Sequence, residues 1–361
     1  AIGAQLPSLN VGGISDLTGA AQLDSSATAS NVGADTFDAT ALAGQDQSVI
    51  GLTTGLGGTF DSPSPAAPGT ENGVLAPNFG AFNIDVASDS NITAQGFNNL
   101  DASASSTAAD AVAAAGYTSA ADASVTGIAS GMSIDVGGVS NLMAQAQGTA
   151  DSSASSVTGL AQSDSGMDAM GIEALQMNVS SDSDLSSTSA VIGSADGEST
   201  SGAATADIDF EAIGIDGIAM NVGGIGTLAS TASVNGSSDA SSVSDMAQAS
   251  ADMDATGIND AHLFSSSDGD ISGTAVINAA VNAINIGTDP DNQAHAFGDF
   301  DADGITELEM GVGGVSTLVG QAQVTVDMNA SSVQGKAQAN SADSGTDAIV
   351  DDLNQITGLG N

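Results

Sequence analysis

The sequence contains no cysteine, no tryptophan and no arginine, and Lys336 is its only strongly basic residue. Without cysteine, the chain can form neither a disulfide scaffold nor a zinc–thiolate site. Without arginine, it has no bidentate clamp for phosphate or carboxylate substrates. Binding to DNA or RNA requires Lys and Arg to neutralise phosphates, so no nucleic-acid partner is expected.

Long apolar runs and large side chains are also scarce. Aromatic residues make up 3% of the chain, so a core built on large rings is not expected. A membrane-spanning helix needs about 20 consecutive apolar residues, and the sequence has no such run. The sequence therefore predicts no membrane span.

Acidic and small residues take the place of the missing types. The 361 residues include 44 acidic groups and 46 glycines, and the formal net charge is −43. High net charge with few aromatics is a signature of disorder. Yet 41% of the residues are hydrophobic, and aliphatic residues occur along the whole length. This distribution favours an ordered chain built on small side chains.

The clearest pattern is an internal repeat. The phrase Val-Gly-Gly-Ile/Val-x-x-Leu begins at Val11, Val136, Val222 and Val312, and weaker copies lie between these four. One hydrophobic anchor marks each copy: Leu17, Ile92, Leu142, Leu185, Leu228, Ile271 and Leu318. Successive anchors are 75, 50, 43, 43, 43 and 47 residues apart. We therefore predict a single array over residues 1–361 with about seven or eight repeats, in which 45–85 is a Pro/Gly-rich insertion or a divergent repeat.

Within each repeat, hydrophobicity alternates with a period of two. After Leu318, small or aliphatic residues such as Ala322 and Val324 alternate with mostly polar ones such as Gln321 and Gln323. This alternation indicates β-strands, whereas the abundant Ser, Thr, Asn and Gly disfavour helix. Each repeat has three such stretches, and the third surrounds an Ala-Ser-Ser-Val phrase. The sequence predicts an all-β fold with three strands in each repeat of about 43 residues.

Two β architectures are consistent with these repeats. In a β-solenoid similar to a parallel β-helix, each repeat is one rung with three faces, and identical residues stack. In antiparallel β-sandwich repeats, strand direction alternates and the copies of a residue do not meet. The constant spacing favours the solenoid, which we expect to stack further into a cross-β fibre.

One short segment suggests a metal. Asp299-Phe-Asp301-Ala-Asp303-Gly304 resembles the start of a calcium loop of the EF-hand or dockerin type. The resemblance implies Asp299, Asp301 and Asp303 as ligands of Ca²⁺. Those families place a glutamate at position twelve, where this chain has Met310, and the nearest acids are Glu307 and Glu309. An Asp-rich turn between strands is the alternative, and no other cofactor is expected to be required.

The sequence gives no catalytic constellation. His262 and His295 have no cysteine partner and no HxxxH spacing, so we expect surface histidines and no general base. Paired carboxylates suited to glycoside hydrolysis are unavoidable among so many acids and carry no information. No catalytic residues are predicted, and the chain is not expected to be an enzyme.

These features lead to a functional hypothesis. A solenoid has two open edges, and head-to-tail stacking of copies gives an open fibre. We expect a secreted structural protein, extracellular or at the cell surface after removal of a signal peptide, that polymerises with itself into a filament for matrix, attachment or a sheath. The alternative is an acidic repeat stalk, adhesin or surface-binding module that binds calcium or another divalent cation. The cytoplasm of a halophile is the other location that extreme acidity suits.

Overall fold

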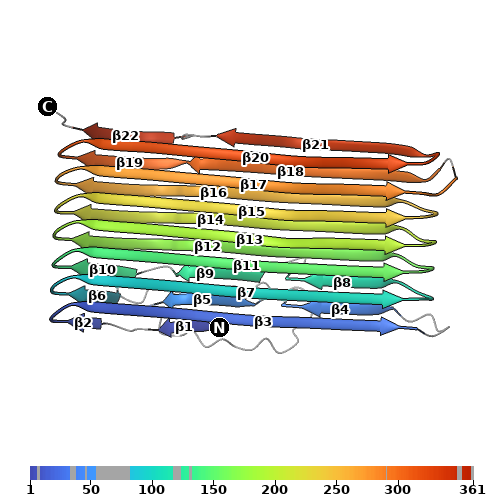
Figure 1. Ribbon diagram of the computed structural model, residues 1–361, viewed down its shortest axis with the longest axis horizontal. Helices are drawn as coiled ribbons and strands as arrows, with labels where there is room; N and C mark the ends of the chain where they lie inside the picture. Colours follow the sequence, from blue (N-terminus) through green and yellow to red (C-terminus); the bar gives the residue numbers. More distant parts are fainter. Residues whose placement is uncertain are drawn as a thin grey trace, which may run out of the picture.

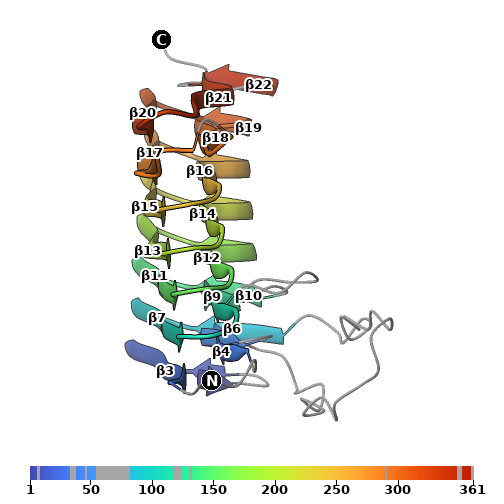
Figure 2. The same ribbon diagram turned by 90° about the vertical axis from the view of Figure 1, so that its right-hand side faces the viewer.

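A computed structural model describes residues 1–5, 9–32, 38–44, 47–53, 82–116, 123–129, 132–289, 291–347 and 352–358. All regular structure in these residues is β-strand, and every strand pair is parallel. Two sheets lie face to face, and the chain coils around them from the N-terminal to the C-terminal end (Figures 1 and 2). The predicted β-solenoid is therefore confirmed, and the antiparallel sandwich alternative is wrong.

Sheet B contains seven strands of 17 residues each. They are β3 (Ser15–Asn31), β7 (Ser90–Ser106), β11 (Ser140–Ser156), β13 (Ser183–Ser199), β15 (Gly226–Ser242), β17 (Gly269–Asn285) and β20 (Ser316–Ser332). The seven anchors pair with one another across this sheet, from Leu17 opposite Ile92 to Ile271 opposite Leu318. The repeat period thus sets the strand register.

Sheet A returns the chain on the opposite side. Its middle strands are 19 residues long: β12 (Ala161–Val179), β14 (Ala204–Val222) and β16 (Ala247–Ser265). The others are shorter: β1 (Ile2–Gln5), β2 (Leu9–Val11), β4 (Ala39–Ala43), β5 (Ser48–Thr53), β6 (Phe82–Val86), β8 (Ala111–Ala115), β9 (Ala123–Ile128), β10 (Met132–Val136), β18 (Gln293–Ile305), β19 (Glu307–Val312), β21 (Lys336–Asp347) and β22 (Asp352–Gly358). We call one sheet B strand with the sheet A strand or strands that follow it a coil.

The coil has two faces, and the expected three faces are wrong. The Ser-Ser-Val phrase ends a sheet B strand, and its valine lies exposed in the turn, as Val157 does. The stretch that begins at an anchor such as Leu142 forms the rest of the same sheet B strand, and the remaining stretch, such as the one from Ile172 to Val179, belongs to a sheet A strand. A kink interrupts this sheet A stretch at Ala174, Gly217 and Asp260, whose φ angles are 47°, 78° and 55°. These three residues hold equivalent positions in β12, β14 and β16, so the kink recurs in successive coils without ending the strand.

Two clusters of inward side chains fill the space between the sheets. Alanine dominates one, together with Phe210 and Phe300. The other contains Ile, Leu, Met and Val, including the anchors from Ile92 to Ile271. Alanine gains little from burial at about 25 cal/mol per Å², so the ladders and the second cluster provide most of the stabilisation of each coil.

Turns at one edge alternate between two types. Coils with Gly-Gly turns, such as Gly137-Gly138, follow coils whose turns end in Asp, such as Asp89. The Asp89 carboxylate accepts a hydrogen bond of 2.9 Å from the N–H of Val139. A Cβ on Gly138 would lie 2.2 Å from Asp89 Oδ1, so glycine is required there. The same arrangement recurs with Asp182 below Gly224 and Ile225, and with Asp268 below Gly314 and Val315.

Residues 45–85 were predicted to be an insertion or a divergent repeat. Two strands from this range belong to sheet A: β5 lies between β1 and β9, and β6 lies between β2 and β10. Residues 45–46 and 54–81 lie outside the described residues. The insertion and the extent of the array over the whole chain stay predictions.

Candidate functional site

The residues predicted to bind calcium lie in extended strands. Asp299, Asp301 and Asp303 are alternate residues of β18, so their side chains project from one face of sheet A. Phe300 and Ala302 between them are buried. The segment is therefore neither the loop of an EF-hand nor a turn between strands. Glu307 and Glu309 lie on the next strand, β19, and calcium binding by these five residues stays a prediction.

The structure instead brings Asp299 and Asp301 to the edge of a larger array. Asp299 lies opposite Asp252, which lies opposite Asp209. Asp301 begins a second column that continues through Asp254, Glu211 and Asp168. A third, shorter column pairs Asp164 with Asp207. The carboxylate block comprises Asp164, Asp168, Asp207, Asp209, Glu211, Asp252, Asp254, Asp299 and Asp301.

Like charges stack in this block at the strand spacing of about 4.8 Å. Burial, reinforced by the charge of Asp209, raises the pKa of Asp168 to about 6. Burial also raises the pKa of Asp164 to about 6, although a hydrogen bond from Gln162 opposes the change. For Asp254, burial and then the charges of Asp252 and its other acidic neighbours raise the pKa to about 7. Protons therefore bind this face more tightly than they bind an unfolded chain.

Carboxylate oxygens are the ligands that hard cations prefer. The block presents them in register columns on sheet A, where Asp164 is itself buried and four other members, Asp207, Asp209, Asp252 and Asp299, line a groove of about 360 Å³. Among the described residues, no group of three or more Asp, Glu or His is placed to hold a metal ion. The block is thus an extended anionic surface.

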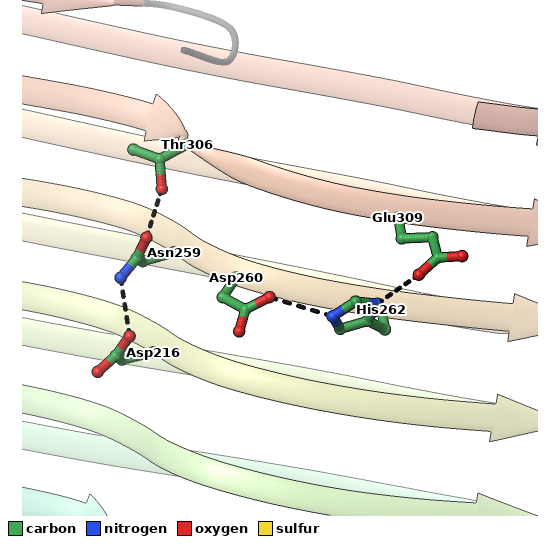
Figure 3. A network of polar contacts seen from close by, with 6 residues as sticks. All are labelled: Asp216, Asn259, Asp260, His262, Thr306 and Glu309. Atoms are coloured by element: carbon green, nitrogen blue, oxygen red, sulfur yellow. Dashed lines mark hydrogen bonds and ion pairs between the residues drawn. The ribbon is translucent and has the colours of Figure 1, made fainter. Parts of the chain in front are cut away.

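His262 joins two coils through two carboxylates (Figure 3). Its Nδ1 lies 2.8 Å from Glu309 Oε2, and its Nε2 lies 3.2 Å from Asp260 Oδ1. The side chain of His262 is partly exposed, as the sequence predicted. Both ring nitrogens face carboxylates, so neither is free in this arrangement to act as a base toward a substrate.

A second polar contact crosses the coils beside this histidine (Figure 3). Asn259 donates from Nδ2 to Asp216 Oδ1 at 2.8 Å and accepts at Oδ1 from the Thr306 hydroxyl at 2.6 Å. Asp216, Asn259 and Thr306 belong to three successive coils. Neither contact was predicted from the sequence, although Asp216 and Asn259 are 43 residues apart and His262 and Glu309 are 47 apart, close to the repeat length.

Amide ladders run along both sheets. On sheet B, Asn91 Nδ2 donates to Asp16 Oδ1 at 2.8 Å, and Asn141 Nδ2 donates to Asn91 Oδ1 at 2.9 Å. Two further pairs are Asn278 with Asn235 at 2.8 Å and Asn282 with Asp239 at 2.7 Å. In each pair the donor lies in the later coil. Asp at the start of a ladder provides an acceptor and leaves no amide donor unpaired.

A surface groove runs beside the Gly-Gly turns. It has a volume of about 870 Å³, and its walls include Asp85, Asp135, Asn178, Asn221 and Phe264. Asn178 donates to Asp135 at 2.8 Å, and Asn221 donates to Asn178 at 3.1 Å. Asp135, Asn178 and Asn221 thus form one hydrogen-bonded row along this wall.

The two ends of the solenoid differ from its middle. β3 and β20 are the outermost described strands of sheet B. In the anchor column, the interior members Ile92, Leu142, Leu185, Leu228 and Ile271 are no more than 2% exposed. Leu17 and Leu318 at the ends are only partly buried. In the described part of the chain, each end of sheet B therefore presents a strand with one neighbouring strand, beside incompletely covered core residues.

Comparisons with known proteins add no relatives. A scan against models of protein families, a search of curated proteins and a search of solved structures each found no match. No helix long and apolar enough to cross a membrane occurs in the described part of the chain.

Proposed function

We propose that this chain is the subunit of a self-assembling, extracellular structural filament in which solenoids stack end to end. The observation that carries the proposal is the match between the two open edges of sheet B. β3 and β20 have the same length of 17 residues and occupy equivalent registers. A second copy placed on β20 through its β3 would continue the parallel ladder.

Inward side chains would match across this junction. By the register of the intervening strands, Leu318 would meet Leu17 of the next copy, and Val324 would meet its Leu23. In both matches the end residues are partly buried in the single chain. Covering the remainder of each such Leu or Val would contribute about 1 kcal/mol, in addition to the backbone hydrogen bonds of the new ladder.

Outward charges are compatible with the junction. In the same register, Asp16 would meet Thr317, Asp24 would meet Thr325, and Asp327 would meet Ser26. No carboxylate would lie directly opposite another, so the junction would contain none of the like-charge pairs that destabilise neighbouring strands. The junction thus avoids the repulsion present in the carboxylate block.

Stacking of unlike ends does not close on itself and gives a polar filament. Seven sheet B strands would advance the filament by about 34 Å per copy at the usual strand spacing. Such a filament would be mechanical in function, and the acidic faces along its length would keep neighbouring filaments apart.

Electron microscopy and fibre diffraction of the purified chain test the proposal. We expect uniform filaments with an axial reflection near 4.8 Å. Val324→Asp should prevent growth, because it places a charge on the inward face of β20. Val319→Asp is the matched control, because Val319 lies on the outward face of the same strand. Persistence of the wild-type chain as separate short rods at all concentrations would contradict the proposal.

The alternative prediction, an acidic stalk or adhesin module that binds calcium, has its own test. Calcium titration would compare the wild-type chain with a variant carrying Asp299→Asn, Asp301→Asn and Asp303→Asn. Saturable binding that this variant loses would support the alternative, whereas equal heats for both proteins would count against it.

A further inference from the structure

The short strands at the two ends of the chain occupy the same columns of sheet A. β2 pairs with β6 so that Val11 lies opposite Val86. β22 pairs with β19 so that Gly358 lies opposite Val312. The intervening pairs connect Val86 with Val312 in one column. β2 and β22 are therefore equivalent elements at opposite ends of the solenoid.

This equivalence creates a conflict in the proposed filament. The path β2-β6-β10-β12-β14-β16-β19-β22 has eight levels, whereas sheet B has seven strands. When β3 of a second copy lies on β20, β2 of that copy falls at the level that β22 already occupies. One of the two strands must leave its position.

The lengths of the strands at the two ends of sheet A indicate whether β2 or β22 leaves its position. β1 and β2 contain 4 and 3 residues, whereas β21 and β22 contain 12 and 7. Among the described strands, β4 pairs only with β8, so its other edge lacks a strand. Ala337 of β21 lies in the same column as Ala39 of β4, and the members between them are also alanines. β21 and β22 would together cover β4, β5 and β6 of a second copy, whereas β1 and β2 cover only β5 and β6.

We infer that β1 and β2 form a plug on the assembly edge, and that β21 and β22 of a second copy of this chain displace the plug when the copies join. This inference rests on the proposed function and describes how growth of the filament would be regulated. The plug is held by few contacts, which include an Ala87 N–H bond to Val11 O at 2.9 Å and an Ile50 N–H bond to Ala1 O at 2.8 Å. Short terminal strands of this kind open at little cost in free energy. Release of the plug would set the rate at which the end of a chain becomes able to bind another copy.

A reversible lock tests the inference, because the chain has no cysteine of its own. Asn10 and Asp85 are register partners on β2 and β6, and both are exposed. Adjacent strands lie about 4.8 Å apart, within the range that a disulfide spans. The double variant Asn10→Cys/Asp85→Cys would hold the plug in place when oxidised and free it when reduced. An interior lock, Asn141→Cys/Asp184→Cys, joins exposed register partners on β11 and β13 and is the matched control.

We expect the oxidised plug variant to assemble at least roughly tenfold more slowly than its reduced form, because locking lowers the fraction of competent ends. The interior lock should leave the rate unchanged, and a variant lacking residues 1–11 should assemble faster than the wild-type chain. Filaments that grow at the wild-type rate from the oxidised plug variant would overturn the inference while leaving the filament itself intact. Absence of filaments from the wild-type chain would instead overturn the proposed function.

Discussion

The outer faces of the two sheets stack like residues at the same spacing with opposite results. On sheet B, Asn278 donates a hydrogen bond to Asn235 in the preceding coil. On sheet A, Asp254 lies between Glu211 and Asp301, and burial and like charge raise its pKa. An amide both donates and accepts, whereas an ionised carboxylate only accepts. Repetition therefore stabilises a column of Asn and destabilises a column of Asp.

The difference shows that a parallel ladder repeats, in every coil, the interaction between neighbouring copies of a residue, whether that interaction is favourable or unfavourable. Asp16 begins an amide ladder, where it has an amide donor above it and no acidic register partner. Acidic residues inside the carboxylate block, such as Asp252, have acids on both sides. The position of a carboxylate within its column decides its contribution to stability.

The largest expected effect comes from neutralising part of the block. Like charges about 5 Å apart repel by nearly 1 kcal/mol even in a water-like medium. The triple variant Glu211→Gln/Asp252→Asn/Asp254→Asn should therefore raise the free energy of unfolding at pH 8 by about 2 kcal/mol. The triple variant Asp184→Asn/Asp270→Asn/Asp327→Asn removes the same charge from sheet B, where these acids have no acidic register partners. Equal stabilisation by both variants in thermal unfolding would refute a specific role of the block.

Stability should also depend on pH in a defined direction. The pKa values of Asp164, Asp168 and Asp254 are raised from 3.8 to between about 6 and 7. The folded chain therefore binds more protons than the unfolded chain in this window, so the free energy of unfolding falls as pH rises. Melting temperatures measured from pH 4 to pH 8 should decline, and the block variant should show a flatter profile. A melting temperature that increases over this range would contradict the assignment.

A smaller effect should follow from changing one amide. Asn278→Asp removes the donor to Asn235 and should cost about 1 kcal/mol, the usual worth of one hydrogen bond. Asn235→Asp leaves the Asn278 donor with an acceptor and should be nearly neutral. Chemical denaturation of both variants measures the contrast. Equal losses would show that the direction of the ladder is unimportant.

The smallest effect concerns salt. Screening acts over about 10 Å at 0.1 M ionic strength and over about 3 Å at 1 M, so concentrated salt weakens repulsion between neighbouring columns. The melting temperature of the wild-type chain should rise by about 1 °C in 1 M sodium chloride, and that of the block variant should rise less. An identical response of the two proteins would assign the salt effect to something other than the block.

Much of the fold could be predicted from the sequence, because the anchors repeat at a spacing that the strand register reproduces. The number of faces could not, because Ser and Ala suit both strands and turns. The phrase around Val157 was expected to form a strand of its own, but Ala154, Ser155 and Ser156 end β11 and Val157 lies in the turn after it. The kink at Gly217 leaves the alternation on either side intact.

The candidate site was harder to predict for a related reason. Asp299-Phe-Asp301-Ala-Asp303 has the spacing of a calcium loop, but it also has the alternation of a strand with Phe300 and Ala302 turned inward. The local sequence cannot distinguish these two structures. Alignment of this segment with residues 252–256 and 209–213 reveals the columns, because the neighbouring strands provide the other carboxylates.

Because Gly-Gly turns and Asp turns alternate, successive coils of the solenoid are of two kinds. Its true translational unit is two coils, which should add a reflection at about 9.6 Å, twice the strand spacing, to the diffraction of a filament. The last described coil has the turn Gly313-Gly314, and the first has Gly12-Gly13. Each junction between copies would therefore place two Gly-Gly turns in succession and omit one Asp contact. A filament under tension should break at these junctions, so its fragments should contain whole numbers of subunits.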